Sequence, residues 1–143
     1  MKFKHLTFTI TLAYFWVMMI LFGSIVLETF MVFPNIFRDP PQSLESAMDF
    51  LSTRGPGDFF PPLGFVSWLT GVGAIVLGWR IKTARYWIIA SVLMIFLEGI
   101  VSILFFWPRN TIMFLEGTSV HSAEYLRQVA REFEALHWLR LLF

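Results

Sequence analysis

Long apolar runs separated by short polar segments dominate the chain. The first run extends from Leu6 to Phe37, the second from Phe59 to Trp79, and the third from Tyr86 to Trp107. About 20 apolar residues are enough to cross the hydrocarbon core of a bilayer, so each run predicts a transmembrane helix. We expect Pro108 to end the third helix, because proline lacks the backbone N–H that a helix interior requires.

A fourth helix is predicted over residues 122–143, although it becomes apolar only from Phe133. That apolar part is too short to cross a membrane. Either this helix projects into its own bundle, or the natural chain continues beyond Phe143. We favour the second interpretation, because the sequence stops inside an apolar run without a helix-ending residue. The expected fold class is therefore all-α: one domain, an up-and-down bundle of four transmembrane helices with the last one truncated.

The polar segments predict two connecting loops, residues 38–58 and 108–121. Within the first loop, Ser43 to Leu51 has the pattern of a short amphipathic helix, with Ser43 as its N-cap. Asp58 is expected to cap the second transmembrane helix, whose first turn would then contain Pro61 and Pro62.

Small residues recur along one face of the second predicted transmembrane helix. Their spacings of four, three and four place them on one side: Ser67, Gly71, Ala74 and Gly78. Small residues let helix backbones approach closely in lipid, so this face predicts helix packing.

Composition supports a membrane protein. The 143 residues are 57% hydrophobic and only 15% charged, whereas soluble domains carry about 25% charged residues. The absence of cysteine excludes disulfides, thiolate metal sites and a cysteine nucleophile. The net charge of +1, without a long basic cluster, argues against nucleic acid as a partner. The expected partners are the lipid bilayer and either a membrane protein or a second copy of the chain.

The distribution of charge predicts the orientation. Basic residues without acidic neighbours occur at the N-terminus and in the turn from Arg80 to Arg85, whereas acids outnumber bases in both long loops. The positive-inside rule therefore places the N-terminus in the cytoplasm, with the loops outside, and suits a plasma (inner) membrane protein. The first apolar run is longer than the roughly 7–15 apolar residues of a secretory signal, so we expect an uncleaved helix.

Two carboxylates within the apolar runs are the first candidates for function. A charge at the bilayer centre costs at least about 2.5–3.5 kcal/mol and rarely faces lipid. Glu98 lies 13 residues after Arg85, roughly 20 Å from the inner surface at about 1.5 Å per residue. Glu28 is expected near the outer interface. The alternative role for both is a protonated or hydrogen-bonded group that ties helices together.

The last helix adds further candidates. Its polar stripe, which we expect to enter the membrane from the outer side, consists of Arg127, Arg131, Glu134 and His137. The Glu134-x-x-His137 step has the spacing that di-iron bundles use for two ligands. With Glu98 and Glu28, the set of candidate ligands suits one metal ion better than two. We therefore predict that Glu28, Glu98, Glu134 and His137 converge on one cavity with Arg131 at its mouth, the alternative being a solvated start of the helix.

Three stretches resemble a known family. Gly23 to Pro34, Trp107 to Ile112 and His137 to Arg140 are similar to motifs of the small four-helix membrane proteins grouped with the anthrone oxygenases. The resemblance covers most of the chain in layout, but an asparagine beside the final arginine is missing and the last helix is incomplete. It implies a four-helix topology and, as activity, the oxidation of polyketide anthrones by molecular oxygen.

Two functions follow from these features. In the first, the chain is an oxygenase or oxidoreductase for a hydrophobic aromatic substrate. Glu98 and His137 would then be general bases or metal ligands, and Arg131 or Arg140 would hold an oxyanion. In the second, the chain is a non-catalytic accessory subunit that packs against a larger membrane complex through the small-residue face and its many phenylalanines. No cofactor is identified beyond the single metal ion considered above.

Overall fold

The first apolar run forms one long helix with a wider turn inside it. In the computed structural model, which describes residues 2–142, α1 (Lys2–Leu27) leads into a π-helical turn, η1 (Glu28–Val32), and then into α2 (Phe33–Ile36). The Phe33 N–H bonds to the carbonyl of Glu28, five residues back. Pro34 lies two residues after the end of this turn, where the regular bonding pattern is already displaced.

The predicted amphipathic segment in the first loop is a helix, but its expected cap is wrong. The helix α3 extends over Gln42–Phe50, with Pro41 at the N-cap position and no side-chain cap. The hydroxyl of Ser43 instead accepts a hydrogen bond from the Asp39 N–H at 3.2 Å. Leu44 and Ala47 bury the apolar face of α3.

The helix formed by the second apolar run, α4 (Pro56–Gly78), begins earlier than predicted. Pro56 lies in the first turn, where a backbone N–H has no partner within the helix, so its missing N–H removes no hydrogen bond. Asp58 is therefore inside the helix, and its carboxylate accepts a hydrogen bond from the Gly55 N–H at 2.9 Å. The predicted small-residue face is confirmed, because the buried residues of α4 are Ser67, Gly71, Ala74 and Gly78.

The third run continues through Pro108, so the predicted end of this helix is wrong. It comprises α5 (Lys82–Val101), the π turn η2 (Ser102–Phe106), α6 (Trp107–Thr111), the π turn η3 (Ile112–Glu116) and α7 (Gly117–Val120). The Trp107 N–H bonds to the carbonyl of Ser102. The π turn displaces the bonding pattern immediately before Pro108, as it does before Pro34, and the helix passes the proline without ending.

The last helix, α8 (Ala123–His137), tightens at its end into a 3₁₀ segment, η4 (Trp138–Leu142). Ser122 caps its start, accepting from the Tyr125 N–H at 3.3 Å. The face of α8 and η4 that packs into the protein consists of Leu126, Val129, Ala130, Phe133, His137 and Arg140.

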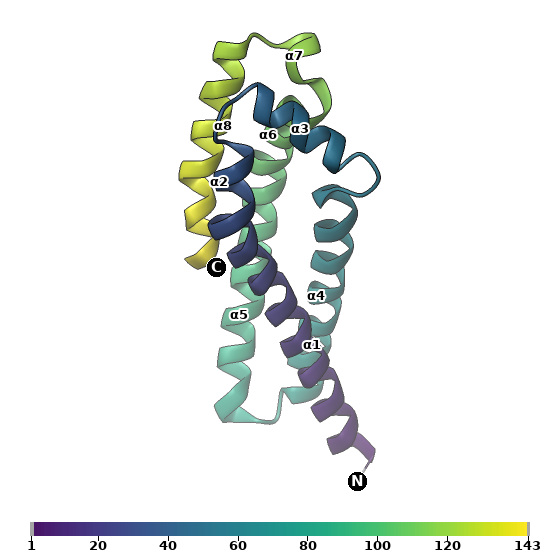
Figure 1. Cartoon of the computed structure of the whole chain (residues 1–143). Coiled ribbons are helices and arrows are strands. Elements are labelled where there is room, and N and C mark those ends of the chain that lie inside the picture. Colours follow the sequence, from purple (N-terminus) through teal and green to yellow (C-terminus); the bar gives the residue numbers. More distant parts are fainter. Residues whose placement is uncertain (1, 143) are drawn as a thin grey trace.

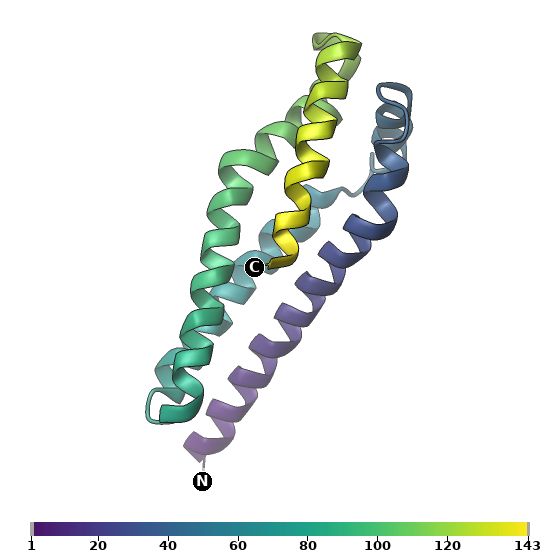
Figure 2. The same ribbon diagram turned by 90° about the vertical axis from the view of Figure 1, so that its left-hand side faces the viewer.

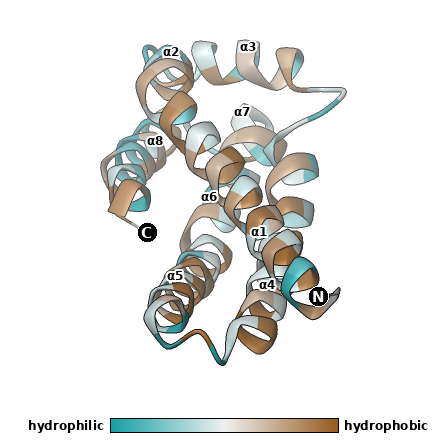
Figure 3. Cartoon of the chain, turned by 90° about the horizontal axis from the view of Figure 1, so that it is seen from below, coloured by the Kyte–Doolittle hydropathy of each residue, from teal (hydrophilic) through white to brown (hydrophobic). Residues whose placement is uncertain are grey.

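Within residues 2–142 the protein is all-helical, and three helices are long and apolar enough to cross a membrane. They extend over Phe3–Ile36, Pro56–Gly78 and Lys82–Val120. Many of their large apolar side chains are exposed on the outside of the bundle, which suits contact with lipid. Hydropathy colouring of the ribbon shows that hydrophobic residues predominate along α1, α4 and α5 (Figure 3).

The helices form an elongated bundle with distinct ends (Figure 1). The N-terminus and the turn between α4 and α5 lie at one end, and α3 and α7 lie at the other. The helix α8 descends from the second end beside α2, and the chain ends partway along the bundle (Figure 2). The buried core is in two parts: one between α1, α4 and α5 around Tyr14, and one around Phe133 beneath α8.

Candidate functional site

Arg140 and Glu98 form the centre of a buried polar cluster. The Nε of Arg140 donates to Oε1 of Glu98 at 2.8 Å, and its Nη2 lies 2.7 Å from the same oxygen. The hydroxyl of Ser102 donates a second hydrogen bond to this oxygen at 2.7 Å. Both charged side chains are about nine-tenths buried, with 9% of Arg140 and 12% of Glu98 exposed. Removing one partner would leave the other charge buried without compensation.

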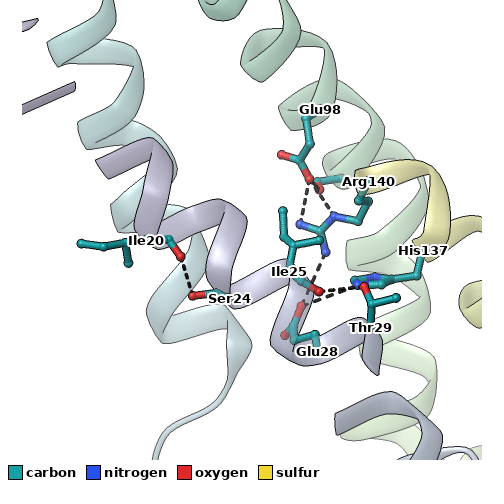
Figure 4. Close-up of polar contacts among 9 residues, drawn as sticks. Ile20, Ser24, Ile25, Glu28, Thr29, Glu98, His137 and Arg140 are labelled. Carbon is teal, nitrogen blue, oxygen red and sulfur yellow. Dashed lines mark hydrogen bonds and ion pairs between the residues drawn. The ribbon is translucent and has the colours of Figure 1, made fainter. Parts of the chain in front are cut away.

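Glu28 and His137 lie on the other side of the guanidinium (Figure 4). The Oε2 of Glu28 is 3.9 Å from Nη1 of Arg140 and 4.0 Å from Nε2 of His137. Neither separation is short enough for a hydrogen bond. Within residues 2–142, Oε2 of Glu28 and both ring nitrogens of His137 are buried without a hydrogen-bond partner. Buried polar groups are normally paired, so these atoms call for a specific explanation.

Local helix geometry places these side chains together. Glu28 opens the π turn η1 and Ser102 opens η2. Turns of this type occur frequently at functional sites, because the extra residue changes the direction of the side chains around it. Glu98 and Ser102 are four residues apart and share one helix face. His137 and Arg140, three residues apart across the 3₁₀ segment, also share a face.

Aromatic rings surround the cluster. His137 stacks on Phe133 with ring centroids 5.8 Å apart and meets the edge of Phe33 at 4.5 Å. The guanidinium of Arg140 lies 4.9 Å from the centre of the Phe106 ring, within cation–π range. The site is thus a small polar group inside an apolar and largely aromatic shell, where electrostatic interactions are stronger than in water.

The structure brings some of the predicted site residues together and leaves others apart. Glu28, Glu98 and His137 are brought together, and Arg140, named in the enzyme interpretation, lies between the two carboxylates. Arg131, expected at the mouth, is exposed on the outside of α8.

Glu134 is half-buried, and among the described residues it has no hydrogen bond or ion pair to the cluster. The face of α8 that packs inward follows Leu126, Val129 and Phe133, and the predicted stripe from Arg127 through Arg131 lies beside that face.

Of the four expected metal ligands, Glu28, Glu98 and His137 belong to the cluster and Glu134 does not. Among residues 2–142, no three acidic or histidine side chains are grouped closely enough to hold one. The guanidinium of Arg140 lies between Glu28 and Glu98 and supplies the positive charge that a metal would provide. The Glu134-x-x-His137 step contributes only His137 to the cluster.

Ser102 is the polar member that sequence reasoning missed. The sequence feature that could have identified Ser102 is its four-residue spacing from Glu98, because this spacing lets a serine hydroxyl reach a carboxylate on the same helix face. A serine inside an apolar run is also an ordinary packing residue, so the spacing alone did not single it out.

A second, more exposed ion pair joins α6 to α8. The Nη2 of Arg109 donates to Oε2 of Glu132 at 2.9 Å, and the Gln128 side chain donates to the other oxygen at 3.0 Å. Hydrogen bonds from Gln128 and Arg109 lower the pKa of Glu132 below its ordinary value. Because 40% of the Glu132 side chain is exposed, this pair contributes little to stability.

No family model, curated protein or solved structure matches the chain. The resemblance to the anthrone oxygenase-like proteins therefore rests on the three sequence motifs alone.

Proposed function

We propose that this chain is a four-helix protein of the plasma membrane, with its N-terminus in the cytoplasm. In this topology α8 enters from the outer side and forms the fourth wall around the cluster. Two observations support it: the basic turn and the N-terminus share one end of the bundle, and α3 and α7 share the other. The buried face of α8 also packs against the helices that carry Glu28 and Glu98.

We further propose an enzymatic function: oxygen-dependent oxidation of a hydrophobic aromatic substrate by a general base. One observation carries this proposal. Oε2 of Glu28 is buried, has no hydrogen-bond partner among the described residues, and faces the equally unpartnered His137. A structural carboxylate would be expected to accept hydrogen bonds, as Glu98 does. An unpartnered one is free to accept a proton from a substrate.

The four side chains take different roles in this proposal. Glu28, assisted by His137, removes the proton. Arg140 stabilises the oxyanion that forms when the carbanion delocalises onto a neighbouring ring carbonyl. The sequence favoured Glu98 as a base, but its Oε1 already accepts two hydrogen bonds and lies in an ion pair with Nη2 of Arg140. Glu98 therefore positions Arg140 and balances its charge.

The overall reaction uses only the substrate and molecular oxygen. The base removes a proton from an activated methylene group, and the carbanion adds oxygen and a proton to give a hydroperoxide. Loss of water then leaves a carbonyl. One methylene and one O₂ become one carbonyl and one water, with the four electrons of the two C–H bonds transferred to oxygen. The class of substrate follows from the resemblance and agrees with the aromatic shell around His137.

A hydroxylated anthrone is the appropriate probe for the full chain reconstituted in nanodiscs. Oxygen uptake should match the formation of anthraquinone, and a chelator should leave the rate unchanged. Glu28→Gln preserves shape and should lower the rate by at least about 100-fold, the lower range for a general base. Glu132→Gln, which removes a carboxylate outside the cluster, should retain full activity. A wild-type rate equal to that of empty nanodiscs would refute the proposal.

The accessory-subunit interpretation has lost one of its supports. The small-residue face of α4 is used within the chain, since a Cβ on Gly71 would lie 2.7 Å from Cγ2 of Val92. Its remaining support is the set of exposed aromatic side chains, which lipid would cover equally well. Co-purification of a fixed partner chain would favour that interpretation.

A further inference from the structure

A groove lies at the end of the bundle that contains the N-terminus. It has a volume of about 620 Å³, within the range of about 300–1,000 Å³ that small-molecule sites occupy. It lies between the start of α1 and the end of α4, and its lining is Phe3, Ile75, Val76, Leu77, Trp79 and Arg80. Five of these six residues are apolar, and the single charge comes from Arg80.

A specific contact joins the two helices whose residues line this groove. Thr7 is 7% exposed, and its hydroxyl lies 3.0 Å from the carbonyl of Phe3 and 3.4 Å from that of Leu77. The first turns of α1 are thereby held against the last turn of α4. The groove is consequently bounded by two helices in contact.

The charge around the groove has one sign. Residues 2–27 and 59–97 contain no aspartate or glutamate, but they include Lys4, Arg80 and Lys82. Arg80 is exposed and has no hydrogen bond or ion pair within residues 2–142. Arg85 differs, because its guanidinium donates to the Tyr86 hydroxyl at 2.6 Å and lies over the Tyr86 ring.

We propose that this groove binds one anionic glycerophospholipid. An acyl chain lies along the apolar wall of Phe3, Ile75 and Val76, and the headgroup phosphate pairs with Arg80. Trp79 lies at the level of the headgroup, where tryptophan is enriched in membrane proteins. In the proposed topology this end faces the cytoplasmic leaflet, which is the anionic one. The site is separate from the Glu28–Arg140 cluster and does not depend on its chemistry.

Native mass spectrometry of the detergent-purified full chain tests this site. The probes are phosphatidylglycerol and phosphatidylcholine with identical acyl chains. We expect one phosphatidylglycerol to be retained about fivefold more strongly than phosphatidylcholine, equivalent to about 1 kcal/mol for one basic residue at the surface. Arg80→Gln should abolish this preference, and Arg80→Lys should keep most of it. Arg54→Gln is the matched control, because it removes an exposed arginine at the other end of α4.

A second variant tests the groove itself. Val76→Trp fills the apolar wall without changing charge, and should reduce retention of both lipids at least threefold while helix content by circular dichroism stays unchanged. Equal retention of the two lipids by the wild-type chain would overturn the proposal. So would loss of the preference in Arg80→Gln with no effect of Val76→Trp, because that result assigns lipid binding to the basic turn alone.

Discussion

Arg140 directs two of its nitrogens, Nε and Nη2, at the same oxygen of Glu98, at 2.8 and 2.7 Å. This contact joins the 3₁₀ segment η4 to α5 across 42 residues of sequence. It also turns the remaining Nη1 of the guanidinium toward Glu28, 3.9 Å away. One side chain thus holds the end of the last helix in the bundle and sets the distance between the two carboxylates.

Glu98→Gln should destabilise the protein strongly. The change leaves Arg140 buried without its closest counter-charge, which typically costs about 3–5 kcal/mol. The measurement is unfolding in mixed micelles followed by circular dichroism. Glu132→Gln, at the more exposed pair, should cost less than about 1 kcal/mol. Equal losses in the two variants would mean that Arg140 has an alternative partner and that Glu98 does not hold η4.

Gly71→Ala should destabilise the bundle, whereas Gly64→Ala on the same helix should not. A Cβ on Gly71 would lie 2.7 Å from Val92 and 3.0 Å from Tyr14, but a Cβ on Gly64 would meet nothing within 4 Å. Overpacking typically costs about 1–3 kcal/mol, and Ala is favoured over Gly in a free helix position by up to about 1 kcal/mol. Thermal unfolding of the two variants compares them directly. A gain in stability from Gly71→Ala would show that α4 lies farther from α1 and α5 than it does in this structure.

The ion pair between α6 and α8 should weaken in acid. Hydrogen bonds from Gln128 and Arg109 lower the pKa of Glu132 below its ordinary value of 4.5. A carboxylate with a lowered pKa contributes stability that is present above pH 4.5 and is lost as pH falls through the lowered folded-state pKa. Carbon-detected NMR titration of the Glu132 carboxyl measures this value. Gln128→Ala should shift the titration midpoint of Glu132 upward. An unchanged midpoint would show that the Gln128 hydrogen bond does not lower the pKa of Glu132.

The proposed topology can be tested by cysteine labelling, since the chain has no cysteine of its own. Cysteines introduced at Ser46 and Ser119 lie on exposed positions at one end of the bundle, and Thr83 is exposed at the other. An impermeant maleimide should label the first two on intact cells and Thr83→Cys only after lysis. The reverse pattern would place the N-terminus outside the cell.

The sequence by itself determined the features that depend on local composition. Long apolar runs predicted the three helices that are long and apolar enough to cross a membrane, and the four-three-four spacing predicted the packing face that contains Gly71. The short helix α3 was also predicted, because its amphipathic pattern is complete within nine residues.

Only the tertiary structure decided which residues form the polar cluster. The π turns at Glu28–Val32 and Ser102–Phe106 each add a residue to a helical turn, so every residue that follows lies on a different face of the helix than a regular pattern would predict. The second of these turns also lets the helix continue past Pro108. The inward face of α8 was set by apolar packing around Phe133, so Arg140 rather than Arg131 reached the carboxylates. Pairing between side chains 42 residues apart depends on the packing of whole helices, and a periodic pattern within one helix cannot specify it.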